Sequence, residues 1–519
     1  MRPGFRLPVW FRLWLLVLYL GGSLIPGSTF GATTGAPRLV FPEGLDWLNV
    51  ERPLSAQDLK GKITILDFWT YGCINCIHVV EELRQLEERF GDKLAVIGIH
   101  SPKFDNEKNL ETLRNTVVRL DRRHPIVNDP DWLLMDLYRV RAWPTLAVFT
   151  PDGRWLGRVT GEGNEDRLGR AIDKLLELYP DEIDERPLPI ALEKAGFSDS
   201  RLAAPGKITV DNGGARVAIS DTLHHRVIVT DADGKVVRTF GSGEQGLRDG
   251  FAGEAQFNAP QGLVFGDDIL MVADAGNHAV RSLDLTDGRV TTLAGTGRIG
   301  LLRSGEYDAL HLDLRSPWDL ALKGGNLYIA MAGNHQIWRL GLQDGKIRPY
   351  AGSRREGIDT GPLTGASFSQ PSGLALIGEN LYVADAEASA VRHIRMDKDE
   401  VENLVGKGLF EFGDRDGDLD DAQLQHASGV ALLDKDGLVI ADTYNHKVKL
   451  LDLKNGVVKT LLGTGQPGSK LGSLSETQLN EPNGVAVLDG RILVADTNNH
   501  RILELDPDAG TVREWKLED

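Results

Sequence analysis

Cysteine is the residue that this sequence has least of. Its 519 residues include only two, Cys73 and Cys76, and both lie in the segment WTYGCINCIH. A scaffold held together by several disulfides is therefore excluded. A disulfide between residues three apart closes too small a loop to restrict the unfolded chain much, so a structural staple explains the pair poorly. Reversible chemistry explains it better.

Positive charge is also scarce. Lysine and arginine number 58 against 75 aspartates and glutamates, which gives a formal net charge of −17. A surface of this sign repels phosphates, so we expect no nucleic-acid partner. The composition is otherwise that of a folded protein, and the length is enough for two to four domains.

The N-terminal segment, residues 1–32, has the layout of a secretory signal. Arg2, Arg6 and Arg12 precede the apolar run LWLLVLYL, and small residues follow. That run is short of the about 20 residues that a membrane helix needs, although an uncleaved anchor stays open. Cleavage would change the formal charge from −17 to −20, since the segment holds three arginines and no acid. We expect an extracytoplasmic protein, periplasmic or secreted, in a cleaved or a membrane-anchored form.

The two cysteines lie where a strand is expected to end and a helix to begin. KITILDFW, residues 62–69, reads as a strand buried on both faces, and IHVVEELRQLEERF, residues 77–90, has helical spacing. A further helix is expected in NEKNLETLRNTVVRL, residues 106–120. A sulfur at a helix N-terminus meets unpaired N–H groups and the positive end of the helix dipole, which favour a thiolate. We predict that Cys73 is the nucleophile and that Cys76, one turn further in, resolves the mixed disulfide.

A second segment, VRAWPTLAVFTPDGRWLGRV, reads as a loop, Pro144, a strand over 145–149, a turn and another strand. Together with L-D-F-W before the cysteines, it resembles the thioredoxin superfamily. The resemblance implies an α/β thioredoxin-like domain over residues 38–180 and a cis Pro144, with the Trp143 backbone free to pair with an extended substrate. It also implies that Asp67 is partly desolvated, has a raised pKa, and takes the proton of Cys76. The competing interpretations are a solvated Asp67 and a trans Pro144.

Other chemistries fit the cysteine pair less well. Zinc needs four ligands, and His78, His100 and His124 would have to converge on the two sulfurs. A peroxidase of the peroxiredoxin type would have a threonine where Thr70 stands, but also a proline where this chain has Leu66. We therefore predict no metal. The residues Gly72, Ile74 and Asn75 differ from those of thioredoxins and of strong oxidants, so the direction of electron flow stays open.

The second half of the chain is a repeat. ISDTLHHRV, VADAGNHAV, IAMAGNHQI, VADAEASAV, IADTYNHKV and VADTNNHRI align at intervals of about 55 residues. Each unit reads as P-x-G-L, four short strands and a Gly-rich connector, without a convincing helix, which is typical of a β-propeller blade. The Asn-His pairs resemble the NHL repeat family. We predict a six-bladed all-β propeller over residues 205–519, joined by a linker, residues 181–204, with room for a short helix.

Several apparent functional motifs are better explained by their positions in the repeat. GSGEQG, GTGRIG and GTGQPG match a dinucleotide-binding fingerprint, but a strand rather than a helix follows each, so they are blade connectors. DRDGDLDD, residues 414–421, lacks the glycine and glutamate positions of a calcium loop. The repeated histidines, which are His225, His278, His335, His446 and His500, are predicted to form turns. Met331 and Ser389 depart from the pattern. We predict no cofactor.

The order of domains is similar to NHL-repeat-containing thioredoxin-like proteins. The leading hypothesis is an exported thiol-disulfide oxidoreductase whose propeller docks a protein substrate or a redox partner. The first alternative is an interaction scaffold, in which the first domain is regulatory or inert. The second alternative is a propeller enzyme with a metal in the central channel.

Overall fold

The computed structural model describes residues 37–194, 200–301 and 304–519. The chain divides into two compact units, residues 1–195 and 196–519. The predicted signal, residues 1–32, lies outside the described residues. Within the described ranges, no helix is both long enough and apolar enough to cross a membrane.

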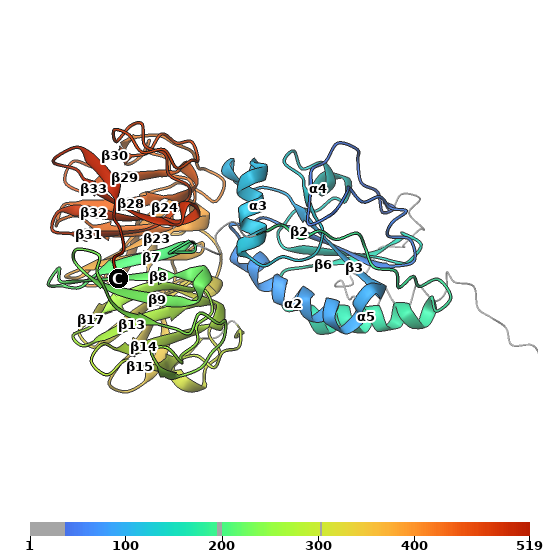
Figure 1. Ribbon diagram of the computed structural model, residues 1–519, viewed down its shortest axis with the longest axis horizontal. Coiled ribbons are helices and arrows are strands. Elements are labelled where there is room, and N and C mark those ends of the chain that lie inside the picture. The colour runs from blue at the N-terminus through green and yellow to red at the C-terminus, as the bar shows by residue number, and fades with distance from the viewer. Residues whose placement is uncertain (1–36, 195–199, 302–303) are drawn as a thin grey trace, which may run out of the picture. The chain divides into compact units, whose positions relative to one another are not determined.

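The first unit is built on a six-stranded mixed sheet (Figure 1) with the order β1-β4-β3-β2-β5-β6. Strands β2, β3 and β4 are parallel, whereas β5 and β6 join the sheet antiparallel. The strands are β1 (Trp47–Leu48), β2 (Ile63–Trp69), β3 (Leu94–His100), β4 (Ile126–Asn128), β5 (Thr145–Phe149) and β6 (Trp155–Thr160). The helices are α2 (Ile74–Phe90), α3 (Leu110–Arg119), α4 (Leu133–Leu137) and α5 (Glu165–Leu178), with short 3-10 turns η1 (Gly91–Lys93) and η2 (Asn106–Lys108).

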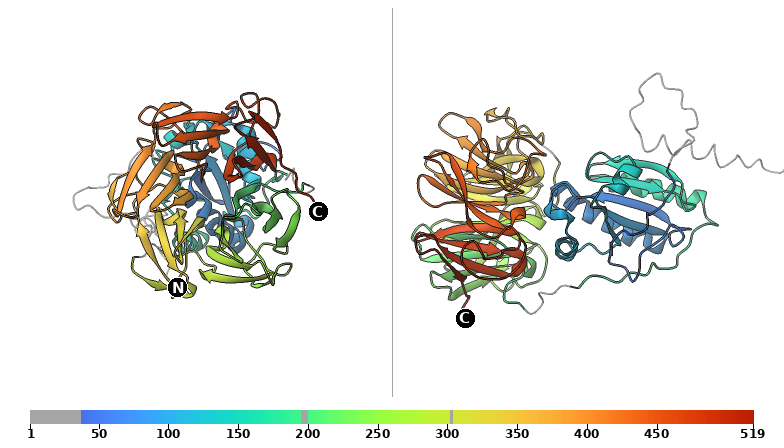
Figure 2. Two further views of the ribbon diagram at one scale, coloured as in Figure 1. Left: turned by 90° about the vertical axis from the view of Figure 1, so that its left-hand side faces the viewer. Right: turned by 90° about the horizontal axis from the view of Figure 1, so that it is seen from above.

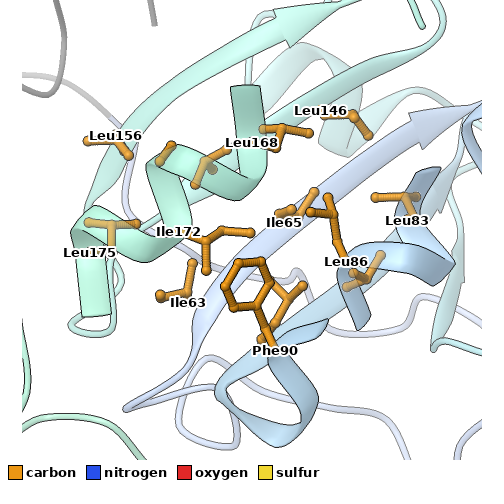
Figure 3. Close-up of a cluster of buried hydrophobic side chains, with 14 of the residues drawn as sticks. Ile63, Ile65, Leu83, Leu86, Phe90, Leu146, Leu156, Leu168, Ile172 and Leu175 are labelled. Carbon is orange, nitrogen blue, oxygen red and sulfur yellow. The ribbon is translucent and has the colours of Figure 1, made fainter. Parts of the chain in front are cut away.

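Apolar layers cover both faces of this sheet, because successive side chains of a strand point to opposite faces. On one face, Ile63 and Ile65 pack against α2 and α5, as Figure 3 shows. On the other face, Leu66 and Phe68 pack into a cluster that includes residues of α4. By the same alternation, Asp67 lies on the same face of the sheet as Ile65, so its carboxyl group projects to the side that α2 covers.

Two features of this unit differ from the sequence-based expectation. The helix expected over residues 106–120 is split into η2 and α3, because the Asn109 side chain accepts hydrogen bonds from the N–H groups of Glu111 and Thr112 and so starts a new helix. Helix α5 was not predicted. The first part of the expected linker, residues 181–194, contains no helix and runs along the first unit, where Ile190 bridges to Val50.

The second unit consists of six antiparallel sheets, one for each predicted repeat. Blade one contains β7 (Pro205–Val210), β8 (Arg216–Asp221), β9 (Arg226–Asp231) and β10 (Val236–Phe240). Blade two contains β12 (Pro260–Phe265), β13 (Ile269–Asp274), β14 (Ala279–Asp284) and β15 (Arg289–Ala294). Blade three contains β17 (Pro317–Lys323), β18 (Asn326–Met331), β19 (Gln336–Gly341) and β20 (Lys346–Ala351).

The remaining blades follow the same plan. Blade four contains β22 (Pro371–Ile377), β23 (Asn380–Asp385), β24 (Ala390–Arg395) and β25 (Glu400–Val405). Blade five contains β27 (Gly429–Leu432), β28 (Gly437–Asp442), β29 (Lys447–Asp452) and β30 (Val457–Leu462). Blade six contains β31 (Pro482–Leu488), β32 (Arg491–Asp496), β33 (Arg501–Asp506) and β34 (Thr511–Glu514).

The blades form a closed ring, visible end-on in the left view of Figure 2. Each first strand neighbours the first strands of the two adjacent blades, and β31 of blade six neighbours β7 of blade one. Blades two to five gain an outer strand from the connector that precedes them. These outer strands are β11 (Gly250–Phe251), β16 (Tyr307–Asp308), β21 (Gly361–Pro362) and β26 (Gly417–Asp418).

The repeated histidines hold neighbouring blades together. Each has the left-handed backbone of a turn, as predicted, with φ between 48° and 56°. Each Nδ1 atom also accepts the N–H of the residue that precedes the opening proline of the next blade, which the sequence did not predict. The donor and acceptor pairs are Ala259 to His225, Ser316 to His278, Gln370 to His335, Glu481 to His446 and Ala204 to His500, at 3.0–3.2 Å. The last pair closes the ring.

The two departures from the repeat keep the architecture by other means. In blade four, Ser389 Oγ replaces the histidine nitrogen and accepts the N–H of His426 at 3.0 Å. In blade three, Met331 replaces the repeated aspartate, and Trp338 stands where blades two and four have an arginine and blade five a lysine. Both side chains are buried in an apolar cluster. An apolar pair thus takes the place of an ion pair there.

Candidate active site

The two cysteines stand at the start of α2, as predicted. Cys73 is the N-cap residue, and its carbonyl group accepts the N–H groups of Cys76 and Ile77, each at 3.1 Å. Both cysteines are free thiols; Cys73 is half-buried and Cys76 is buried. The accessible sulfur is therefore the one nearest the helix N-terminus, where backbone N–H groups favour a thiolate.

The buried sulfur is held in its protonated form. Burial raises the pKa of the Cys76 thiol well above its ordinary value, and both a hydrogen bond with the Cys73 side chain and the charge of Asp67 act in the same direction. A hydrogen bond from the backbone of Thr70 opposes them. For Cys76 to act as a nucleophile, a nearby base has to remove its proton.

Asp67 is the carboxyl group beside the pair, and it is fully buried rather than partly desolvated as expected. It is not alone, because Arg122 Nη1 lies 2.7 Å from Asp67 Oδ2 and both side chains are 0% exposed. Among the residues that the structure describes, the other oxygen, Asp67 Oδ1, has no hydrogen-bond partner. One oxygen is thus fixed by a cation and the other is open.

Arg122 is a site residue that the sequence analysis missed. Besides pairing with Asp67, it donates to the carbonyl group of Cys76 at 2.9 Å, and its guanidinium group lies 3.7 Å from the ring centroid of Trp69. In the sequence it belongs to the basic run DRRHP, which reads as a solvated turn. Its role depends on a contact across 55 residues, which no local pattern reveals.

Glu107 is the second residue that was missed. Its buried carboxylate accepts the Thr70 hydroxyl and the N–H groups of Gly72, Lys103 and Phe104, the last three at 2.7–3.2 Å. These bonds fix the backbone immediately before Cys73. Glu107 falls within the helix expected over residues 106–120, whereas the structure places it in η2, ahead of the new helix start at Asn109, with its side chain buried. The Thr70 hydroxyl is engaged with this carboxylate.

The Trp143–Pro144 peptide bond is cis, as the resemblance implied. Because Phe68 pairs with Thr145 across β2 and β5, Pro144 lies beside the end of β2 that leads to the cysteines. Trp143 is half-buried and packs edge-on against Trp132, with 5.7 Å between the ring centroids. Within residues 37–194, 200–301 and 304–519, no hydrogen bond reaches the backbone of Trp143. Its N–H and carbonyl groups are available for an extended peptide.

The three histidines of the metal alternative have other contacts. His78 Nδ1 lies 2.5 Å from Glu162, His100 Nδ1 lies 3.4 Å from Asn128, and His124 Nδ1 lies 3.7 Å from Glu87. Burial lowers the pKa of His100 to about 3. Over the described parts of the chain, no group of three His, Cys, Asp or Glu side chains could hold a metal ion.

The acids of the calcium-like loop face lysines. Lys449 Nζ lies 2.9 Å from Asp414 and 3.4 Å from Asp416, and Lys447 also contacts Asp414. Pairing with a lysine compensates the charge of a buried or half-buried carboxylate. The loop is therefore explained by the contacts of blade five.

The central channel of the propeller contains two buried charges. Lys207 and Asp319 occupy the third position of the P-x-G motif, where Gly262, Gly373, Gly429 and Gly484 stand in the other blades. Lys207 Nζ donates to the carbonyl group of Ser428, and Asp319 accepts the N–H of Leu374 at 2.8 Å. Burial lowers the pKa of Lys207 to about 8 and raises that of Asp319. These contacts join blade one to blade five and blade three to blade four.

Family models match both units. A thioredoxin-like model matches residues 61–155, and an NHL repeat model matches residues 314–340 and 479–505. The fold class predicted from the sequence, a thioredoxin-like α/β domain followed by a six-bladed NHL propeller, is thus confirmed.

Known proteins resemble the chain over different lengths. The human protein named NHL repeat-containing protein 2 is 41% identical over 504 residues, which cover 90% of this chain and 69% of the human protein. Protein SUPPRESSOR OF QUENCHING 1, chloroplastic, of Arabidopsis thaliana is 42% identical, covering 91% of this chain and 46% of that protein. Thiol-disulfide oxidoreductase YkuV of Bacillus subtilis is 24% identical over 25% of this chain and 87% of its own length.

Proposed function

This chain belongs to the family of NHL repeat-containing protein 2, and from the geometry of its cysteine pair we propose that it is an exported thiol-disulfide oxidoreductase. One observation carries the proposal: a half-buried cysteine at a helix N-terminus is hydrogen-bonded to a buried cysteine that lies beside a buried carboxyl group. The name of the Bacillus subtilis relative, which is similar over 25% of this chain, supports the same chemistry.

The reaction proceeds in two exchanges. The thiolate of Cys73 attacks one sulfur of a substrate disulfide, so that a bond forms between Cys73 and the substrate while the other substrate sulfur leaves as a thiolate. Cys76 then gives its proton to Asp67 Oδ1, and its sulfur attacks Cys73. The Cys73–Cys76 bond forms, the second substrate sulfur leaves, and the substrate disulfide has been reduced. The reverse sequence oxidises a substrate dithiol.

The surrounding residues position these groups. Glu107 fixes the backbone that leads to Cys73, and Arg122 joins Asp67 to the carbonyl group of Cys76. The open backbone of Trp143, beside Pro144, would pair with an extended segment of the substrate as an added strand does. The substrate class is therefore a protein thiol or disulfide.

A trapping experiment tests this proposal. Without the resolving thiol, a Cys76→Ser variant should accumulate a covalent complex between Cys73 and a disulfide substrate, detected as a mass increase that dithiothreitol removes. The Cys73→Ser variant is the matched control and should form no such complex. Failure of the wild-type protein to reduce or oxidise any dithiol or disulfide partner would refute the proposal.

The propeller is assigned to partner docking, since its described residues assemble no group of three metal-ligating side chains and its channel charges are paired within the fold. The same observation favours a second candidate, in which the protein is an interaction scaffold and the first unit is a regulatory or inert adaptor. A Cys73→Ser, Cys76→Ser double variant separates the two. Unchanged partner binding with no change in phenotype would favour the scaffold.

Export remains part of the proposal and rests on the sequence of residues 1–32. Mass spectrometry of the mature protein from its own host would show whether these residues are removed. Release by osmotic shock would indicate a free extracytoplasmic form, and retention in the membrane fraction would indicate a tether. Recovery in the cytosol with an intact N-terminus would contradict export.

A further inference from the structure

The proposed reaction leaves a proton in a place without direct access to water. Asp67 and Cys76 are both 0% exposed. Asp67 Oδ2 is held by Arg122, so the proton that Cys76 loses arrives at Asp67 Oδ1. For the site to turn over, this proton has to leave through other buried groups.

Because Gly98 has no side chain, other side chains approach the backbone closely beside Asp67. The two residues are paired in the parallel ladder between β2 and β3, so their side-chain positions are neighbours on one face of the sheet. A Cβ atom at Gly98 would lie 2.5 Å from Ile126 Cδ1, 3.1 Å from Trp69 Nε1 and 3.3 Å from His124 Nε2, so three side chains already occupy the place that a larger residue would fill. Two ring nitrogens from different segments therefore approach the same point, next to the aspartate.

The polar atoms around Gly98 are short of partners. Trp69 Nε1, His124 Nε2 and Asp67 Oδ1 are all buried, and none has a hydrogen-bond partner within the described ranges. Buried polar atoms of this kind nearly always bind something, and a donor, an acceptor and an imidazole nitrogen together satisfy a water molecule. The three atoms come from β2 and from the segment before β4, so the fold itself brings them together.

His124 connects these buried polar atoms with the surface. Its side chain is 3% exposed, and its Nδ1 atom faces Glu87 of α2 at 3.7 Å, whose side chain is 33% exposed. The segment is held in place by Asn49, which donates to the carbonyl groups of Arg122 and His124 at 2.7 and 3.0 Å. The imidazole therefore has one nitrogen toward the interior and one toward solvent.

We propose that His124 is the proton exit of the buried site, working through a water bound by Asp67 Oδ1, Trp69 Nε1 and His124 Nε2. The water takes the proton from Asp67 and gives one to His124 Nε2, and His124 releases a proton from Nδ1 toward Glu87 and bulk water. No electron moves in this relay. The charged and titratable groups that interact with its members include Cys76, Arg122, Glu87 and His100. The inference rests on the proposed function, because it assigns the path of the proton in the second exchange.

The relay predicts an effect on one exchange only. In a His124→Gln variant, resolution of the mixed disulfide should slow by at least about tenfold, since general acid–base steps are worth about 10²–10⁴-fold. Alkylation of Cys73 by iodoacetamide should be unchanged. The solvent deuterium isotope effect on resolution should rise, and added imidazole should restore part of the rate in a His124→Gly variant. A merely structural role for His124 would produce neither of the last two results.

Glu87 provides a variant that does not disturb the core. Glu87→Gln should slow resolution and shift its pH profile, whereas Glu88→Gln, at the exposed neighbouring position, should not. Both exchanges are followed by stopped flow with a fluorogenic glutathione disulfide. If wild-type protein resolves the mixed disulfide and His124→Gln does so at the same rate and pH profile, the relay is wrong while the oxidoreductase stands. If the wild-type protein forms no mixed disulfide, the proposed function is wrong, and the relay, which depends on it, is wrong too.

Discussion

Two buried ion pairs, one in each unit, are alike in chemistry and different in their surroundings. Asp67 pairs with Arg122 at 2.7 Å in the first unit, and Asp274 pairs with Arg281 at 2.9 Å in blade two; all four side chains are 0% exposed. The difference lies in the rest of the carboxylate. Buried charge by itself therefore does not distinguish a reactive site from a structural contact.

Both oxygens of the propeller carboxylate, Asp274, accept hydrogen bonds. Asp274 Oδ1 accepts the N–H of Asn258, and Oδ2 accepts the Asn277 amide, both at 2.8 Å, in addition to Arg281. Burial is the main reason that the pKa of Asp274 rises to about 6. In Asp67, by contrast, Oδ2 pairs with Arg122, whereas Oδ1 has no hydrogen-bond partner among the residues that the structure describes. A saturated carboxylate holds a fold together, whereas one with an open oxygen can exchange a proton.

Blade three shows that the propeller pair is replaceable. Met331 and Trp338 occupy the corresponding positions, and that blade keeps the same four strands. Replacing a buried ion pair by well-packed apolar residues is often neutral, whereas removing one partner is costly. The same replacement in the first unit would remove the proposed acceptor of the Cys76 proton.

The largest effect is expected from removing one cation of each pair. Arg122→Met and Arg281→Met should each destabilise their own unit by about 3–5 kcal/mol, because a carboxylate is left buried without its cation. Only Arg122→Met should also slow disulfide exchange. Differential scanning calorimetry would follow the unfolding transitions, and two exposed arginines, one in each unit, serve as controls in the variants Arg123→Met and Arg298→Met. Equal stability of the variants and the controls would contradict the comparison.

Removing the carboxylate charge sharpens the comparison further. Asp67→Asn should slow resolution of the mixed disulfide by about 10²-fold, since the amide cannot accept the proton of Cys76. Asp274→Asn should leave both exchanges at their wild-type rates. Stopped-flow fluorescence with a disulfide substrate measures both. A similar slowing in the two variants would show that stability, not proton transfer, sets the rate.

Copying blade three into blade two tests whether the propeller pair is only structural. A double variant, Asp274→Met with Arg281→Trp, should lose about 1–2 kcal/mol, less than Arg281→Met alone, because the groups of Asn258 and Asn277 lose an acceptor while no charge is left buried. Chemical denaturation monitored on the propeller transition measures the difference. A double variant less stable than Arg281→Met would mean that the ion pair has a further role.

The smallest effect concerns the histidine contacts between blades. His225→Ser, which copies Ser389 of blade four, should cost about 1 kcal/mol at pH 8. Burial lowers the pKa of His225 in the fold, so the folded protein favours the neutral ring. Its contribution is complete above the unfolded pKa of about 6.5 and is lost as pH falls through the lower folded pKa. The stability gap between wild type and variant, measured by thermal unfolding at several pH values, should close on acidification; a constant gap would argue against the bond.

Much of this fold was predictable because its signals are local. Residues 145–149 form a strand as expected, the cysteines lie at the start of a helix, and the six repeats appear as six blades. Helix α5 carries a regular apolar face, with Leu168, Ile172 and Leu175 buried, and the periodicity that would have revealed it was present in the sequence.

The parts of the site that were missed depend on distant contacts. Arg122 and Glu107 reach the cysteine loop across the fold, and their neighbours in the sequence are charged residues typical of a surface. The histidine bonds between blades were missed for a related reason, since an acceptor on the next repeat exists only once the repeats are stacked. Local patterns specify which elements form, and the closed structure decides which polar atoms meet.

The contact between His500 and Ala204 joins the last repeat to the first across almost the whole second unit. An open array of repeats can gain or lose a module at its ends, because its terminal modules are capped by polar surfaces. In this closed ring, every blade accepts a hydrogen bond from the next blade and donates one to the blade before it. Deleting a blade would therefore leave a backbone N–H group on one side, and a histidine or serine acceptor on the other, without its present partner. We therefore expect a closed propeller to tolerate changes of length in its loops better than the loss of a blade.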